Sequence, residues 1–386
     1  MIDVLVVGGG PVGLATAICC ARAGLSVTVT EPRTAPVDKA CGEGVMPAAV
    51  RRLAALGVTP DGHPLRGIRY VDAAHQADAR FRHGNGLGVR RTVLHAALAA
   101  RAAALGIPIL PVKVTAFAQN ANHVTAGGIE ARYLVAADGL HSAIRRTLER
   151  DPRIPGPPGI PGPSRSRIAR DQAPQRYGLR RHYRVAPWTD LVEVHWTPQA
   201  EAYVTPVSPD VVGVALLFAK PRLDRLSGSA AANPGATRQE AADGAPDDES
   251  GDFKTRLSAF PALLDRLAGA VPASELRGAG PMRQDVRRRV YGRVLLVGDA
   301  SGYVDALTGE GIGVGLAQAD ALAACLAASR PADYERAWRR ASGPAWRFTA
   351  SLLWSRNHPL LGERLVPFAQ HFPWIFTTLV NHVAEA

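Results

Sequence analysis

The chain has few cysteines, and their positions exclude the common metal sites. Its four cysteines are Cys19, Cys20, Cys41 and Cys325, and no two of them have the spacing of zinc or iron–sulfur ligands. Cys19 and Cys20 fall within a segment expected to form a buried helix. We therefore predict a reduced, cytoplasmic protein that binds no metal.

Long hydrophobic runs are also missing. No uncharged stretch reaches the roughly 20 residues that a membrane-spanning helix needs. The segment that comes nearest, 316–328, is interrupted by Asp320. The apolar N-terminus contains Asp3 and lacks a basic leading region, so it does not have the form of a signal peptide. We expect no transmembrane segment.

Lysine is scarce, and arginine supplies almost all of the positive charge. Of the 45 basic residues, four are lysines and 41 are arginines, and the net charge is +11. The arginines are spread along the chain without a polybasic block, which favours a compositional bias over nucleic-acid binding. We expect no nucleic-acid partner. The positive charge suits anionic dinucleotides and leaves open a peripheral contact with an anionic lipid surface.

The first thirty residues predict a strand, a helix and a second strand. Residues 2–7 form a run that is apolar except for Asp3 and is typical of a buried parallel strand. A helix is expected over 11–23, where Gly24 ends it, and the second strand over 26–31. This order is typical of a Rossmann-like βαβ unit.

A Gly-x-Gly-x-x-Gly pattern joins the first strand to the helix. Gly8 permits the tight turn, Gly10 lets the backbone approach a pyrophosphate, and Gly13 lets the helix pack closely on the strand. The helix begins at Pro11, and its free N–H groups, from Val12 onward, are offered to the phosphates. The pattern therefore predicts a dinucleotide site.

The second predicted strand ends at Glu31, eighteen residues after Gly13. A carboxylate at this point can accept hydrogen bonds from ribose hydroxyls. Pro32 and Arg33 follow Glu31 directly, and we include them in the predicted nucleotide site.

The middle of the chain predicts two further helices and then a sheet. One helix is expected over 47–56 and another over 92–105, with Thr92 as its N-cap. Residues 183–218 alternate in the manner of antiparallel strands, which would form the floor of a substrate domain.

Two segments have the composition of flexible loops. Residues 151–176 contain seven prolines, and residues 227–252 contain six acidic residues against one arginine. Neither segment has enough large apolar side chains to offset the entropy lost on ordering.

Two later motifs complete the pattern. Asp138 and Gly139 are followed by Ser142 and Arg145, and a predicted buried strand over 294–297 leads into a Gly-Asp pair. A glycine-rich loop then opens the last helix of this region. These motifs contain Gly298, Asp299, Gly309, Gly311 and Ile312.

In this order, the three motifs resemble the p-hydroxybenzoate hydroxylase-like superfamily of flavoproteins. The resemblance implies FAD as cofactor, with Asp299 at the ribityl chain and the loop over 309–313 at the flavin pyrimidine edge. It also places Arg91 at the FAD pyrophosphate and Val114 at the adenine. A single nucleotide fingerprint implies that NADH or NADPH, if it is the electron donor, binds only transiently.

The resemblance predicts an α/β fold in which a Rossmann-like FAD-binding domain is interwoven with an antiparallel β-sheet substrate domain. The FAD-binding domain is expected over 1–70, 88–150 and 277–330, and the substrate domain over 71–87 and 177–276. A helical region follows over 331–386. Its apolar stripe, which includes Phe376 and Val380, is consistent with docking onto the protein body or with a lipid-facing patch.

Two blocks resemble a different branch of this superfamily. The run from Cys41 to Gly44 and the run from Gly298 to Gly311 are similar to geranylgeranyl reductases. The prenyl reductase substrate-loop motif is only half present at Tyr203. The tryptophan halogenase motif is absent, which argues against halogenation.

Three residues are candidates for catalysis beside the flavin. Cys41 is a potential proton source, and a small packing residue is the alternative. Glu43 is a candidate acid or base, and a flavin-contacting carboxylate is the alternative. Tyr203 is a candidate substrate contact, with a core tyrosine as its alternative.

The leading hypothesis is an NAD(P)H-dependent flavin monooxygenase that uses O2 to hydroxylate or epoxidise a lipophilic, aromatic or polyketide-like molecule. The alternative is a geranylgeranyl reductase-like flavoenzyme that saturates isoprenoid C=C bonds. A third hypothesis is a flavoprotein that binds a partner without catalysis.

Overall fold

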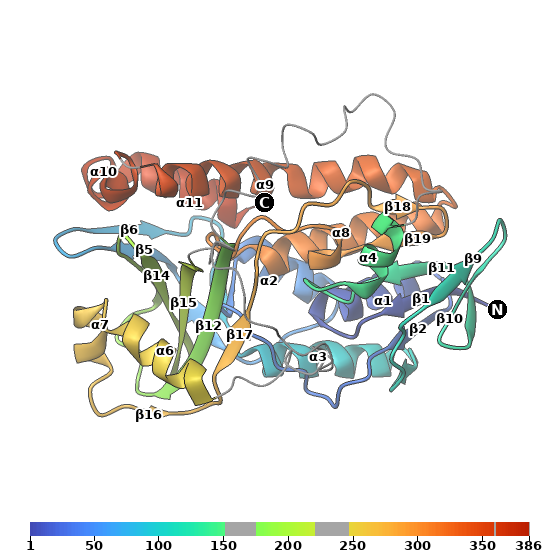
Figure 1. Ribbon diagram of the computed structural model, residues 1–386, viewed down its shortest axis with the longest axis horizontal. Coiled ribbons are helices and arrows are strands. Elements are labelled where there is room, and N and C mark those ends of the chain that lie inside the picture. Colours follow the sequence, from blue (N-terminus) through green and yellow to red (C-terminus); the bar gives the residue numbers. More distant parts are fainter. Residues whose placement is uncertain (151–174, 221–246, 359, 386) are drawn as a thin grey trace, which may run out of the picture.

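The computed structural model describes residues 1–150, 175–220, 247–358 and 360–385. Two large β-sheets lie side by side, and the C-terminal helices run across one side of both (Figure 1). A third, small sheet is formed by β3 (Gly44–Val45), β7 (Gly86–Gly88) and β4 (His63–Leu65).

The first large sheet is Rossmann-like. Its main path runs β18-β19-β11-β1-β2-β8, in which β19, β11, β1, β2 and β8 are parallel to one another and β18 is antiparallel to β19. The hairpin β9-β10 extends it from β11. Its strands are β1 (Ile2–Val7), β2 (Val27–Thr30), β8 (Ile109–Leu110), β9 (Phe117–Gln119), β10 (Val124–Ala126), β11 (Ile129–Ala136), β18 (Val290–Tyr291) and β19 (Val294–Leu296).

Both faces of β1 are buried from Val4 to Val7, which explains the continuous apolar sequence of these four residues. Val4 and Val6 belong to a core with the helices on one face, whereas Leu5 and Val7 pack into a second core on the other. The helices of the first face are α1 (Pro11–Arg22), α2 (Pro47–Ala55), α3 (Arg91–Ala104) and α8 (Gly311–Ala327). α4 (Ala143–Arg150) covers the opposite face.

The second large sheet runs β16-β12-β15-β14-β13-β5-β6, with β17 also paired to β12. It is antiparallel except between β13 and β5, which are parallel. This one parallel pairing departs from the predicted antiparallel sheet. Its strands are β5 (Gly67–Val71), β6 (Gln76–Arg80), β12 (Gln175–Arg184), β13 (Leu191–Trp196), β14 (Ala200–Ser208), β15 (Val211–Lys220), β16 (Val271–Pro272) and β17 (Arg277–Ala279).

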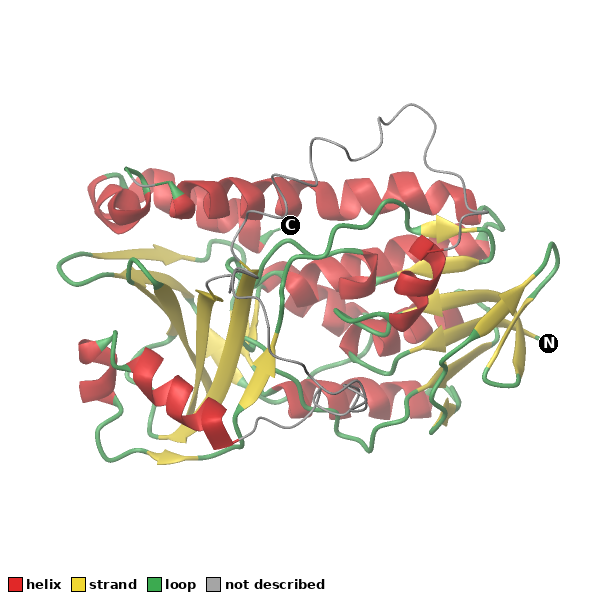
Figure 2. Ribbon diagram, in the orientation of Figure 1, coloured by secondary structure: helices red, strands yellow, loops and turns green. Residues whose placement is uncertain are grey.

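Helices pack on both faces of the second sheet (Figure 2). α6 (Asp247–Leu257) and α7 (Pro261–Arg266) cover one face through Phe253 and Leu263. α10 (Leu365–His371) and α11 (Pro373–Ala384) contribute Val366 and Phe376 to a core with residues of the other face. The long helix α9 (Tyr334–Asn357) packs on α8.

The predicted loop segments fall mostly outside the described residues. Their ends differ from the prediction, because residues 175–176 lie in β12 and residues 247–252 lie in α6. The expected domain boundary at 70/71 cuts β5, and the boundary at 276/277 leaves β17 outside the predicted substrate domain, although both strands belong to the second sheet. Strand pairing, which depends on distant partners, extends these elements beyond the limits that local composition suggests.

Among the described residues, no helix is long and apolar enough to cross a membrane. The described part of the chain also contains no cluster of three or more side chains that could hold a metal ion.

Candidate functional site

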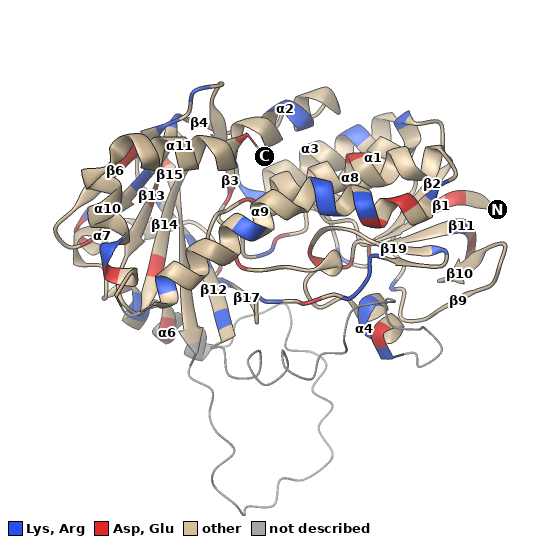
Figure 3. Cartoon of the chain, turned by 90° about the horizontal axis from the view of Figure 1, so that it is seen from above, with Lys and Arg blue, Asp and Glu red and all other residues tan. Residues whose placement is uncertain are grey.

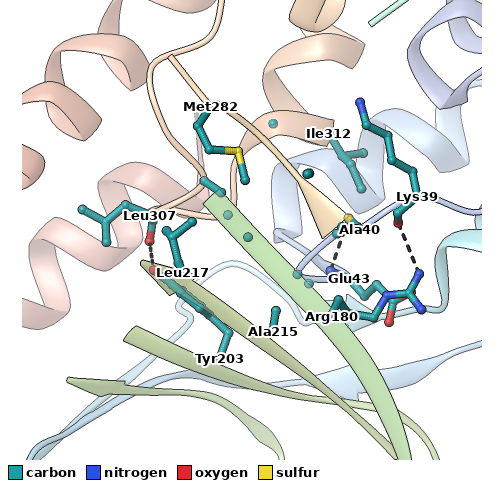
Figure 4. Close-up of a pocket in the computed structure, with 18 of the residues that line it drawn as sticks. Lys39, Ala40, Glu43, Arg180, Tyr203, Ala215, Leu217, Met282, Leu307 and Ile312 are labelled. Carbon is teal, nitrogen blue, oxygen red and sulfur yellow. Dashed lines mark hydrogen bonds and ion pairs between the residues drawn. The ribbon is translucent and has the colours of Figure 1, made fainter. Parts of the chain in front are cut away.

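A single cavity of about 920 Å³ joins the glycine motifs to the second sheet (Figure 4). Its polar end is lined by Gly10, Pro11, Val12 and Gly13 and by the segments that follow β2, β11 and β19. Its other end is lined by the face of β13, β14 and β15 and by the C-terminal helices. One cavity therefore offers room for a dinucleotide and for a second molecule.

In the first glycine motif, Gly8 and Gly13 have no room for a side chain, whereas Gly10 does. Gly8 has φ +108°, and a Cβ there would lie 2.4 Å from the carbonyl oxygen of Ala137. A Cβ on Gly13 would lie 1.9 Å from the carbonyl oxygen of Gly8, so this glycine permits close packing. A Cβ on Gly10 would meet only Nη2 of Arg91, at 3.9 Å, so Gly10 leaves open space.

The open space at Gly10 faces the N-terminus of α1. This helix begins with Pro11 and has no side-chain cap, so its first N–H groups are available to an anion. Gly8 does not line the cavity and shapes only the turn.

Arg91 and Asp138 supply buried polar atoms that point to a ligand. Arg91 Nε and Asp138 Oδ1 are buried without a hydrogen-bond partner among the described residues, and both residues line the cavity. Burial raises the pKa of Asp138. The other oxygen of Asp138 accepts a hydrogen bond from the backbone N–H of Ala143, at 2.8 Å, at the start of α4. These unpaired atoms and the open glycine turn fit a bound dinucleotide.

Glu31 lies next to this turn but does not line the cavity. Its carboxylate accepts hydrogen bonds from the Gly9 N–H at 2.9 Å and from Arg33 at 2.8 and 2.9 Å. Burial opposes ionisation, but these bonds hold the pKa of Glu31 below its usual range. Arg33 lines the cavity whereas Pro32 does not, so a ribose contact with Glu31 requires Arg33 to move.

The adenine contact expected of Val114 stays a prediction. Val114 falls in the connection between β8 and β9 rather than in a strand, and it does not line the cavity. Its side chain packs near Gly127, because a Cβ on that glycine would lie 3.2 Å from Val114 Cγ2.

The third motif lines the cavity at Gly298, Asp299, Gly309, Gly311 and Ile312. Gly298 and Gly309 have φ of +62° and +69°, a region that favours glycine. α8 begins at Gly311 without a side-chain cap, so its positive dipole end faces the cavity.

Neighbouring side chains hold this motif in place. Arg145 is buried and donates to the carbonyl oxygens of Asp299 at 3.2 Å and Leu140 at 2.9 Å. Lys39 Nζ lies 3.7 Å from Asp299 Oδ2. Glu310 precedes α8, and burial raises its pKa to about 7.

Glu43 is the centre of a buried network. Its backbone has φ +60°, and its carboxylate accepts a hydrogen bond from the Arg91 N–H at 2.8 Å. Its other oxygen lies 2.5 Å from His182 Nε2, and His182 Nδ1 lies 2.8 Å from Ser274 Oγ. In this structure, Glu43 positions the start of α3 and Arg91, which lines the cavity.

This network corrects the expected start of α3. The helix begins at Arg91 with Arg90 at its N-cap, not at Thr92, because the Glu43 carboxylate supplies the acceptor from a distant segment. His182 and Ser274 are not predictable members of the site, since neither stands near Glu43 in the chain and no local pattern marks them.

Cys41 and Tyr203 both line the cavity. The Cys41 sulfur lies 3.4 Å from the backbone N of Glu43, which donates to it, and the residue is half-buried. The Tyr203 hydroxyl donates to the carbonyl oxygen of Leu307 at 2.7 Å (Figure 4). Burial raises the pKa of Tyr203 far above its usual value. The hydroxyl of Tyr203 therefore ties the sheet floor to the third motif.

The far end of the cavity is apolar and is built largely by the C-terminal helices. Phe376 packs against Tyr70 of the sheet with the two rings tilted and their centroids 4.7 Å apart. The apolar side chains that these helices place in the lining are Phe348, Leu352, Leu365, Phe368, Phe376, Leu379, Val380 and Val383. The predicted stripe thus packs on the protein body and also faces the cavity.

Comparison with known proteins agrees with this geometry. Residues 1–160 match the family model described as an FAD binding domain. The N-terminal part of the chain is therefore similar to FAD-binding domains, and the chain as a whole is similar to FAD-dependent oxidoreductases of the predicted superfamily. A flavoprotein/dehydrogenase structure from Cytophaga hutchinsonii has a TM-score of 0.74 at 18% identity, and the match covers 99% of this chain and 93% of that one. The α/β fold is therefore confirmed.

The names of other relatives denote different activities. A menaquinone reductase from Mycolicibacterium smegmatis is 52% identical over 56 residues, which are 14% of each chain. The chloroplastic geranylgeranyl diphosphate reductase of Oryza sativa is 29% identical over 80% of this chain and 63% of its own length. The anhydrotetracycline hydroxylase OxyS from Streptomyces rimosus is similar in structure, with a TM-score of 0.67 and 24% identity over 99% of this chain and 76% of that one.

Proposed function

We propose that this chain is an NAD(P)H-dependent flavin monooxygenase that acts on a lipophilic aromatic or polyketide-like molecule. The observation that carries the proposal is the continuous cavity, which runs from the dinucleotide turn at Gly10 to the apolar lining at Phe376. A molecule with an aromatic head and a long apolar part matches its two-ended form.

The proposed reaction balances as an oxygen insertion. NAD(P)H supplies two electrons, one atom of O2 enters the substrate as a hydroxyl or an epoxide, and the other leaves as water. When bound, FAD would accept the hydride and activate O2. Gly10, Gly13 and Arg91 would hold its pyrophosphate, and Asp299 would accept hydrogen bonds from its hydroxyl groups.

The residues of the chain then have binding and shielding roles. The sheet floor around Tyr203 and Leu217 and the side chains of α11 would exclude water from the substrate. Cys41 lines the cavity beside Glu43 and is the candidate proton donor on this side. Glu43 has both carboxylate oxygens engaged, so its proposed contribution is to position Arg91.

A second candidate function is saturation of isoprenoid C=C bonds. It is supported by the likeness to the Oryza sativa reductase over 80% of this chain and by the place of Cys41 in the cavity. In that reaction the substrate gains two hydrogen atoms, and O2 is not consumed.

Single-turnover assays separate the two candidates. The holoprotein is reduced with NADH or NADPH and mixed with 4-nonylphenol under ¹⁸O2, or with geranylgeranyl diphosphate under nitrogen. Monooxygenation gives an alkylphenol product that carries one ¹⁸O atom and forms only when O2 is present.

Hydrogenated geranylgeranyl diphosphate formed without oxygen, and lost in Cys41→Ser, would replace the monooxygenase proposal with the reductase. Peroxide release with every phenolic probe would also contradict monooxygenation.

A further inference from the structure

The C-terminal helices carry an exposed apolar patch at their outer side. Trp354, Leu360 and Trp374 are 63, 69 and 68% exposed. The other large apolar side chains of the patch are Leu361, Phe368, Phe372 and Leu379. Elsewhere in the described part of the chain, exposed large apolar residues are scattered, whereas these seven all fall within 354–379. We call them the helical patch.

The helical patch is continuous with the cavity. Phe368 of α10 and Leu379 of α11 are both exposed and also line the cavity. The cavity therefore reaches the surface within the patch. A lipophilic molecule could pass from the patch to the sheet floor without crossing a polar surface.

Arginines flank the helical patch along α9. Arg336, Arg340, Arg347 and Trp354 are exposed, and their spacing of four and seven residues places them on one side of the helix. Of the charged residues of α9, five are arginines and one is Glu335. Figure 3, which looks down on these helices, shows the basic bands along α9.

Aromatic side chains beside arginines are the combination that binds at a lipid–water interface. Tryptophan and phenylalanine enter the boundary between headgroups and acyl chains, and arginines attract anionic headgroups. A protein partner would not require the apolar surface to open into a cavity.

We propose that the outer side of α9, α10 and α11 docks on an anionic phospholipid bilayer, from which a lipophilic substrate enters between Phe368 and Leu379. The entry of substrate rests on the proposed function, whereas the docking does not. The helices lie on the surface of the bilayer and do not span it.

Vesicle co-sedimentation of the full-length holoprotein tests the docking. We expect binding to vesicles of phosphatidylcholine with phosphatidylglycerol, and a partition coefficient lower by about tenfold on phosphatidylcholine alone. Trp354→Glu with Trp374→Glu should lower it by about tenfold or more on the anionic vesicles. Arg340→Glu with Arg347→Glu should weaken binding on anionic vesicles only.

The matched control is Val271→Glu, since Val271 is an apolar residue of β16 that is 63% exposed and far from the patch. It should bind vesicles as the wild type does. Equal binding by the wild type and both double variants would overturn the proposal. A tryptophan double variant that instead changes the oligomeric state in light scattering would assign the patch to a second copy of the chain.

Failure of the proposed function has a different signature. If no probe is turned over but the vesicle results hold, only the monooxygenase assignment fails. If soluble substrate is turned over but both double variants bind vesicles as the wild type does, only the docking fails.

Discussion

Gly10 and Gly13 stand three residues apart and serve opposite needs. Gly13 is required by the protein itself, because a Cβ would lie 1.9 Å from the carbonyl oxygen of Gly8. Gly10 is required by nothing in the described chain, since a Cβ there meets only Arg91 Nη2 at 3.9 Å. Because no protein atom packs closely against Gly10, the space beside it is open to a ligand.

This difference gives a paired prediction. Gly10→Val should fold normally and lower the affinity for FAD on the order of tenfold or more, because the side chain occupies the pyrophosphate site. Gly13→Ala should destabilise the protein by about 1–3 kcal/mol even without cofactor, because the helix must move away from the loop. Flavin absorbance per chain and urea unfolding of the apoprotein measure the two effects. Full flavin content in Gly10→Val would contradict the site.

Glu310 supplies a prediction for pH. Burial raises its pKa from 4.5 to about 7, so the folded protein binds its proton more tightly than the unfolded chain does. Stability should therefore rise as the pH falls from about 7 to about 4.5, by at most about 3 kcal/mol from this group. Glu310→Gln should lack this part of the pH dependence.

Urea unfolding at a series of pH values measures it, with the exposed Glu363→Gln as control. Identical pH profiles for the wild type and Glu310→Gln would show that Glu310 is ionised throughout this range in the folded state.

Residues with a local signature could be predicted, and residues defined by distant contacts could not. The glycine motifs and Asp299 are predictable because turns and strand ends fix them within a few residues. The partners of Glu43 come from β12 and from the segment after β16, and no periodicity links them to it. The adenine contact of Val114 stays a prediction, because it depends on a resemblance and has no local pattern of its own.

Among the elements, α11 is joined to the second sheet by apolar contacts and by the hydrogen bonds of Asn381. Asn381 is buried, donates to the carbonyl oxygen of Arg80 at 2.9 Å and accepts from the N–H of Arg82 at 2.7 Å. It pairs backbone groups at the end of β6, which is an edge strand of that sheet.

Asn381→Ala should therefore loosen α11. We expect a loss of about 1–3 kcal/mol, because the backbone N–H of Arg82 loses its acceptor. Thr378→Ala is the matched control, since this exposed hydroxyl bonds only to the carbonyl oxygen of Trp374 within α11. Urea unfolding and limited proteolysis near the C-terminus compare them. Equal stability of the two variants would mean that α11 is held by its apolar contacts alone.

Elements with strong periodicity agree closely with their predictions. The strand over 2–7 matches β1, and the predicted helix over 11–23 differs from α1 by one residue. The parallel pairing of β13 with β5 was not predictable, because these strands are more than a hundred residues apart. The start of α6 was missed for a related reason. Its acidic first turn has no apolar side chain, and the apolar contacts of the helix begin at Phe253.

In the molecule as a whole, the two sheets and the C-terminal helices line one cavity that is polar at one end and apolar at the other. The polar end follows from the Rossmann-like order of elements, because the carboxyl ends of β1, β11 and β19 meet there. The apolar end depends on how α10 and α11 return over the second sheet, which the sequence shows only as an amphipathic stripe.

We therefore expect one cavity to hold FAD at its glycine end and a lipophilic molecule at its helical end. A crystal structure of the purified holoprotein with 4-nonylphenol is the sharpest test. The pyrophosphate should contact Gly10 and Arg91, the ribityl chain should contact Asp299, and the alkyl chain should lie against Phe376. Flavin density outside this cavity, or an alkylphenol bound elsewhere with the apolar end filled by side chains, would refute this arrangement.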